Sequence, residues 1–205
     1  EMGFGDKLTP PQVSRDGYYV EGWYLEKECT TPVNDFGLVW TGSEYFAKWN
    51  PNPVSLSATY DGVLFEGGTP SKDNVTVTVN YFDGTTAQVS DFEVDFGNVT
   101  DSAGTKTATV TYTEHGVTVN GEVPLNVAAV ALQSIAATYT GKNIVVGGQL
   151  NHQDITVVAT YTDGSTQTVT NFAVGAFSSA VAGTPTVEIS YTEDNVTVSD
   201  TISVT

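Results

Sequence analysis

The chain has 205 residues and contains few cysteines, histidines and basic residues. Cys29 is the only cysteine, which excludes a disulfide within the chain and a cysteine-based zinc site. The only histidines are His115 and His152, too few for a histidine-rich metal site, and they make Ser-His catalysis a poor prospect. We therefore expect no metal, no cofactor and no catalytic residues.

Positive charge is scarce as well. Seven Lys and Arg face 24 Asp and Glu, so the formal net charge is −17 and the pI is about 4.1. Nucleic acids and anionic membrane surfaces are bound by clustered basic residues, so both are disfavoured as partners. No apolar run approaches the roughly 18 residues of a membrane span, and we expect no membrane insertion.

What the chain does have is an internal repeat, in which residues 57–126 recur as residues 136–205. Tyr81-Phe82-Asp83-Gly84-Thr85-Thr86 recurs as Tyr161-Thr162-Asp163-Gly164-Ser165-Thr166, and Tyr112-Thr113-Glu114 recurs as Tyr191-Thr192-Glu193. The repeat predicts two tandem domains, which we place at residues 51–130 and 131–205.

Each copy has the pattern of β-strands. Val75, Val77 and Val79 alternate with polar residues, the period of a strand with one buried face. The Asp83-Gly84 and Asp163-Gly164 pairs suit tight hairpin turns. Six or seven short strands with regular turns predict a Greek-key β-sandwich in each copy, and the chain as a whole is expected to be all-β.

The repeated motifs resemble bacterial immunoglobulin-like domains of surface proteins. The resemblance is carried by Ala58-Thr59-Tyr60, the Gly67-Gly68 turn, the Asp-Gly hairpin, Ala103-Gly104-Thr105 and the Tyr-Thr-Glu ending, together with their second copies. It implies an immunoglobulin-like fold and a role as a stalk, a spacer or in some cases an adhesive module. It brings no catalytic residues.

The first fifty residues differ in composition and hold all three tryptophans, Trp23, Trp40 and Trp49. Their Gly17-Tyr18-Tyr19-Val20-Glu21-Gly22-Trp23-Tyr24 and Tyr45-Phe46-Ala47-Lys48-Trp49 segments resemble the Listeria–Bacteroides repeat, the internalin-type B-repeat. The resemblance implies a small β-grasp-like module at residues 1–50. The family's leading strand has no counterpart before Glu1, so we expect a truncated module, followed by a short stiff linker at Pro51-Asn52-Pro53.

Few side chains suggest a binding role. Trp23 and Trp49 match the family signature and are expected in the small core. Trp40 does not match it and is the one candidate ligand-binding residue, although we favour core packing for it as well.

Asp91, Glu93 and Asp95 alternate along an expected strand, where a glycosidase-type acid pair is the alternative to a solvated surface. A calcium site is the alternative for the oxygen-bearing residues Asp73, Asn74 and Asp83, but they are scattered and form no Asp-x-Asp-x-Asp loop. We favour the surface.

The joint between the copies is Val127-Ala128-Ala129-Val130-Ala131-Leu132, without glycine, proline or charge. Flexible linkers are polar. We therefore expect the last strand of one copy to pass almost directly into the first strand of the next, with the apolar residues buried and bending limited.

These patterns predict a monomeric, non-catalytic stalk or spacer segment of an extracellular or cell-wall-attached bacterial surface protein. An adhesive role toward a host protein or a glycan stays open. The alternative is a carbohydrate- or protein-binding accessory region of an exported glycoside hydrolase.

Overall fold

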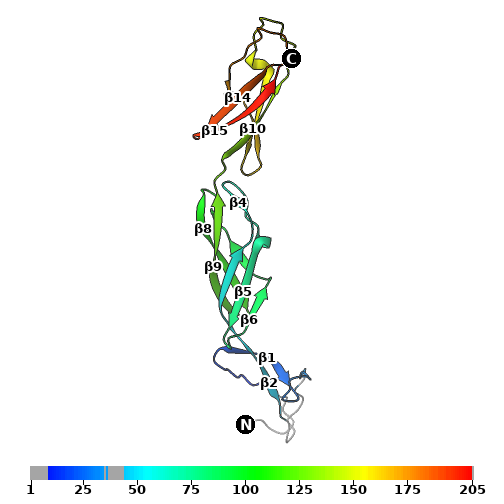
Figure 1. Ribbon diagram of the computed structural model, residues 1–205. Helices are drawn as coiled ribbons and strands as arrows, with labels where there is room; N and C mark the ends of the chain where they lie inside the picture. Colours follow the sequence, from blue (N-terminus) through cyan, green and yellow to red (C-terminus); the bar gives the residue numbers. More distant parts are fainter. Residues whose placement is uncertain (1–8, 35, 37–43, 205) are drawn as a thin grey trace. The chain divides into compact units, whose positions relative to one another are not determined.

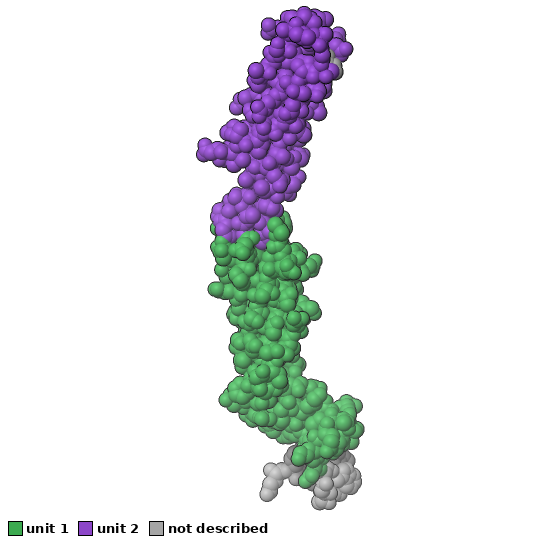
Figure 2. Space-filling view, viewed as in Figure 1, with its two compact units in different colours: residues 1–63, 69–99, 105–126 green, residues 64–68, 100–104, 127–205 purple. Residues whose placement is uncertain are grey.

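The computed structural model describes residues 9–34, 36 and 44–204, and these residues form strands, turns and two short 3-10 turns without an α-helix (Figure 1). The all-β expectation is confirmed. The chain divides into two compact units: one comprises residues 1–63, 69–99 and 105–126, and the other comprises residues 64–68, 100–104 and 127–205 (Figure 2). We describe each unit by itself.

The first unit begins with a two-stranded antiparallel sheet of β1 (Tyr18–Tyr24) and β2 (Phe46–Pro51). A bulge between Val20 and Gly22 shifts its register. Trp23 and Trp49 lie on these strands and are half-buried, and no described residue before Pro53 is fully buried. The expected tryptophan core is therefore only partly enclosed within the part of the chain that the structure describes.

A single residue, Asn52, separates β2 from β3 (Pro53–Tyr60). Its N–H donates to the Gly17 carbonyl at 2.8 Å, and its carbonyl accepts from the Phe82 N–H at 3.0 Å. The predicted three-residue linker is thus a one-residue step between strands, fixed on both sides by backbone hydrogen bonds.

The rest of the first unit is a pair of sheets. In one sheet β3, β5 (Val75–Tyr81) and β6 (Thr86–Val89) lie in that order, with the 3-10 turn η1 (Lys72–Asn74) leading into β5. The other sheet orders β9 (Val117–Ala128), β8 (Gly104–Glu114) and β7 (Glu93–Asp95). Val75, Val77 and Val79 are buried, as their alternation predicts, and Phe92 is buried in the segment between β6 and β7.

The second unit repeats this plan. One sheet contains β10 (Leu132–Tyr139), β11 (Ile155–Tyr161) and β12 (Thr166–Val169), with the 3-10 turn η2 (His152–Asp154) before β11. The other contains β13 (Ala173–Val174), β14 (Thr186–Glu193) and β15 (Val196–Ser203). The buried core between them consists of Leu132, Ile135, Ile155, Val157, Ala159, Val169, Val187, Ile189, Ile202 and Val204.

One short strand was not expected from the sequence. β4 (Leu64–Phe65) runs parallel to the end of β9, with Leu64 opposite Val127 and Phe65 opposite Ala128. All four residues belong to the second unit. Two residues are too few for a periodic pattern, so this pairing has no signal in the sequence.

Candidate functional site

The three acidic side chains that suggested paired carboxylates do not form a site. Only Glu93 and Asp95 lie on β7, because Asp91 precedes the strand, and all three are exposed. Asp95 accepts a hydrogen bond from the Gly97 N–H at 2.9 Å and so completes a local turn. The surface interpretation is the one that the geometry supports.

Asp83 and Asp163 hold equivalent hairpin turns. Asp83 accepts from the N–H and the hydroxyl of Thr85 at 2.9 and 2.6 Å, and Asp163 accepts from Ser165 at the same two distances. The glycine that follows each aspartate has a positive φ, 84° at Gly84 and 82° at Gly164. Hydrogen bonds from Thr85 and Ser165 lower the pKa of both carboxyls. These aspartates build turns.

The two histidines belong to different units and stack on different aromatic rings. His115 sits in the β8–β9 turn with φ 48° and stacks on Tyr19, with ring centroids 3.7 Å apart. His152 lies on η2, not in a loop, and stacks on Phe172 at 4.0 Å. Within the described residues no group of three or more His, Cys, Asp and Glu is arranged to hold a metal ion.

Each copy also contains a cluster of two tyrosines and a glutamate. In the second unit, hydrogen bonding to the Glu193 carboxylate raises the pKa of Tyr161 to about 12. In the first, burial and hydrogen bonds to Tyr112 and Glu114 raise the pKa of Tyr81. The Oε2 atoms of Glu114 and Glu193 are both enclosed without a hydrogen-bond partner. The repeated Tyr-Thr-Glu motif is the sequence signal of these clusters, but it gave no indication that the glutamates are enclosed.

Aromatic side chains gather near the start of the first unit. Trp23 and Tyr45 each make an edge contact with Phe36, at 6.2 and 5.0 Å between centroids. Across β1 and β2, Lys48 pairs with Glu21 at 2.9 Å, and the Lys48 hydrogen bond lowers the pKa of Glu21. Trp40, the candidate ligand-binding residue, lies outside the described residues.

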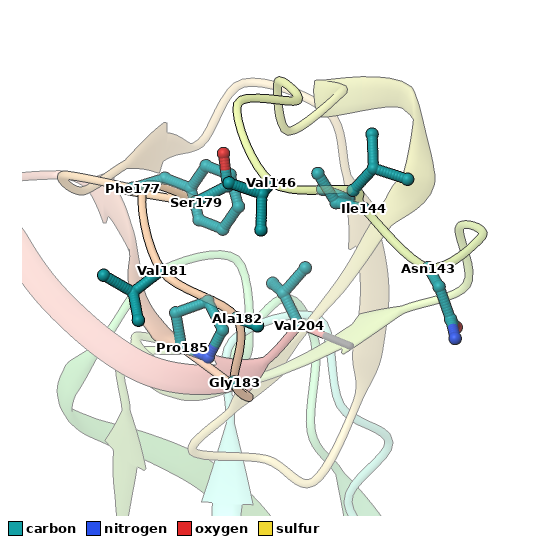
Figure 3. Close-up of a pocket in the computed structure, with 11 residues that line it drawn as sticks. Asn143, Ile144, Val146, Phe177, Ser179, Val181, Ala182, Gly183, Pro185 and Val204 are labelled. Carbon is teal, nitrogen blue, oxygen red and sulfur yellow. The ribbon is translucent and has the colours of Figure 1, made fainter.

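The second unit has an apolar groove of about 340 Å³ (Figure 3). Residues 144–146 and residues 181–185 face each other across it, and Val204 lies between them. Phe177 and Ser179 complete its wall. The groove contains no acid, base or thiol, so it has the chemistry of a binding surface and not of an active site.

Residues 137–205 match the family model of the bacterial Ig-like domain (group 3). This is a non-catalytic type of domain, typical of bacterial surface or extracellular proteins. No curated protein gives a match to the chain. Within the described residues, no helix has the length and hydropathy needed to cross a lipid bilayer. The bacterial Ig-like expectation is thus confirmed for the second copy.

Proposed function

We propose that this chain is a spacer segment of a bacterial surface or extracellular protein, built from a B-repeat-like module at residues 1–50 and two Ig-like domains at residues 51–130 and 131–205. The observation that carries the proposal is the repeated sandwich. The turn aspartates and the tyrosine–glutamate cluster recur in both copies, whereas His115 and His152 stack on rings at non-equivalent positions.

The side chains that recur in both copies stabilise the fold and do not form a catalytic site. The recurring aspartates hold turns, and in both copies a glutamate at the end of one strand raises the pKa of a tyrosine on another strand. A repeated domain adds length and a separately folded body with each copy, which is what a spacer requires.

Single-molecule force spectroscopy tests this proposal. Two copies that fold separately give two main unfolding events, each releasing roughly 230–250 Å of chain for about 70 residues at full extension. The Val79→Ala and Val157→Ala variants are each expected to weaken one event and leave the other unchanged, because the two residues lie in different units. A single cooperative event, weakened equally by either variant, would contradict two independent modules.

A second candidate function is binding of a carbohydrate or a protein by the aromatic cluster of the first fifty residues. It is favoured by the half-buried Trp23 and Trp49, by the Phe36 ring that contacts Trp23 and by the Tyr45 ring that contacts Phe36. Aromatic faces stack on sugar rings and supply rigid contact area to proteins. A glycan array that compares the whole chain with its Trp40→Ala variant tests this function. Binding of the whole chain to one class of glycan, lost in the variant, would support it.

A further inference from the structure

The β8–β9 turn of the first copy and the β14–β15 turn of the second have the same backbone but different residues. His115-Gly116 is the repeat of Asp194-Asn195. The first residue of each pair has φ 48°, and the second has φ 81° at Gly116 and 66° at Asn195. Tight hairpin turns with two positive φ angles favour Asn, Asp and Gly. The second copy follows this preference, and the first copy departs from it at His115.

A residue held in an uncommon backbone conformation points to a role that the turn alone does not require. For His115 that role is a contact with another part of the first unit. Its imidazole stacks on the Tyr19 ring of β1, with centroids 3.7 Å apart and 25° between the ring planes. An aspartate, as at Asp194, has no ring to stack. His115 therefore joins the turn of the sandwich to the two-stranded sheet that precedes it.

Two further contacts join the β1–β2 sheet to the same sandwich. Tyr18 meets the Phe82 ring of the β5–β6 hairpin edge-on, at 5.6 Å between centroids. The Phe82 N–H donates to the Asn52 carbonyl at 3.0 Å. Of these three contacts, the stack of His115 is the one that can gain a charge near neutral pH, because histidine normally changes its charge between about pH 5 and pH 8.

A proton on His115 would meet a favourable group on either side. On its own turn, the Oε1 atom of Glu114 lies 3.9 Å from the imidazole Nε2. Glu114 is 26% exposed, and its Oε2 atom is enclosed without a hydrogen-bond partner, so a positive charge beside this carboxylate is stabilising. On the other side, the face of the Tyr19 ring attracts a cation placed over it.

The charged side chains on the sheet side of the stack have their own partners. Glu21, on the same strand as Tyr19, forms an ion pair with Lys48 of β2 at 2.9 Å. Arg15 lies over the Tyr18 ring at 3.9 Å. These groups keep their charges between about pH 5 and pH 8, so they do not supply a pH dependence in that range.

The titratable side chains on the sandwich side are two tyrosines. Burial raises the pKa of Tyr81 and of Tyr112, and both interact with Glu114. Both tyrosines therefore keep their protons through the neutral range. The charge that changes at this joint is the charge of His115.

We propose that His115 is a proton-dependent clamp, which holds the β1–β2 sheet against the first sandwich more firmly in mildly acidic than in mildly alkaline solution. The native contacts favour the protonated imidazole, so the stabilisation is largest at the lower pH and decreases as the pH rises and the proton is lost. The second copy has Asp194 at this position and lacks the histidine. The clamp is independent of the spacer function, because it is a contact within the first unit.

Amide exchange, resolved for single residues by NMR, tests the clamp in the whole chain at about pH 5.5 and pH 8. The reporter is the Phe82 N–H, and the reference is the Thr162 N–H, which makes the equivalent bond to the Ala131 carbonyl at 2.9 Å. Protection of Phe82, corrected for the intrinsic pH dependence of exchange, should be about three- to tenfold higher at the lower pH, the effect of one cation–π contact and one partly exposed ion pair. Protection of Thr162 should be the same at both pH values.

Two variants identify the groups responsible. His115→Asn keeps a residue that suits the turn but cannot gain a charge, and Tyr19→Leu removes the ring face, so each should abolish the pH effect at Phe82. His152→Asn is the matched control and should retain the effect, since His152 stacks on Phe172 in the other unit. Equal protection of Phe82 at the two pH values in the unsubstituted chain, or a pH effect that survives in His115→Asn, would overturn the proposal.

Discussion

Asp83 and Asp163 show how much a single side chain contributes to this fold. Each accepts two hydrogen bonds from the residue two positions later, and a glycine with positive φ follows each aspartate. The charged carboxylate is the better acceptor for both donors. Ionisation of these aspartates therefore stabilises the native hairpins.

This gives a pH dependence with a defined sign. The pKa values of Asp83 and Asp163 are lowered from 3.8, so the stabilisation is complete above 3.8 and is lost as the pH falls through the lower, native values. We expect the Asp83→Asn/Asp163→Asn double variant to lose less stability than the unsubstituted chain when the pH is lowered from neutral to about 3. Urea unfolding midpoints of both proteins at the two pH values measure this loss, and an equal loss in both would contradict the prediction.

The enclosed glutamates give a second prediction, at high pH. The hydrogen bond with Glu193 raises the pKa of Tyr161 from 10.0 to about 12. The stabilisation that this interaction gives the native state is therefore complete below pH 10.0 and is lost as the pH rises through about 12. Glu193→Gln removes the charge and should return the pKa of Tyr161 toward 10.0.

Tyrosinate absorbance during an alkaline titration measures this shift. Glu188→Gln, on an exposed position of the same strand, is the matched control and should leave the titration unchanged. Equal curves for both variants would show that Glu193 does not set the pKa of Tyr161.

Local chemistry was predictable from the sequence, and contacts between distant residues were not. The Asp-Gly pairs indicated their turns because the donors are two residues away. The stacking of His115 on Tyr19 joins residues far apart in the chain, and no local pattern indicates it. The chemistry of Trp40 in the sequence suggested a binding role, which remains a prediction.

Within the strands, the alternation of valine with polar residues predicts which side chains are buried. Val79 on β5 is fully buried, whereas Thr76 on the same strand is exposed. Val79→Ala should destabilise the first unit by about 2–3 kcal/mol through lost burial and a cavity. Thr76→Ala should change stability by less than about 0.5 kcal/mol. Urea unfolding measures both, and equal losses would contradict a one-sided core.

The step between β2 and β3 depends on Gly17. It has φ 72°, and a Cβ there would lie 2.3 Å from Cγ of Phe82. Tyr18 meets the same Phe82 ring edge-on at 5.6 Å between centroids. The close approach of this backbone to the ring therefore requires a residue without a side chain.

We expect Gly17→Ala to cost more than the roughly 1–2 kcal/mol of a left-handed residue alone. Gly84→Ala is the control, since Gly84 has φ 84° but open space around it. Phe82→Ala in the Gly17→Ala background should recover the excess by removing the clash. Equal losses for the Gly17 and Gly84 variants in thermal unfolding would mean that the ring does not restrict the step.

Short elements are where the sequence was least informative. The strand alternation of β5 and β11 was confirmed, but β4 has two residues and its partner lies in another part of the chain. Such a pairing depends on register across the fold, which periodicity along the chain does not encode.

Over the chain as a whole, the connection between β9 and β10 is as short as the sequence predicted, since β9 ends at Ala128 and β10 begins at Leu132. Burial is only partial, because Val127 and Leu132 are buried while Ala128 and Ala129 are exposed. Thr162 holds the connection, and its hydroxyl accepts from the Ala131 N–H at 3.0 Å and donates to the Ala129 carbonyl at 3.2 Å.

Thr162→Val keeps the shape of that side chain and removes both hydrogen bonds. We expect faster amide exchange and faster proteolysis at residues 129–131, with no change in the core of the second unit. Thr168→Val, at an exposed position on β12, is the control. Limited proteolysis followed by mass spectrometry reads the cut site, and equal cutting of both variants would show that Thr162 does not hold the connection.

The parallel pairing of β4 with Val127 and Ala128 has a consequence for synthesis. Leu64 lies near the start of the domain at residues 51–130, and the residues that complete its edge lie near the end of the same domain. The edge cannot close while the ribosome still holds those residues, so its closing is timed by translation of the whole domain.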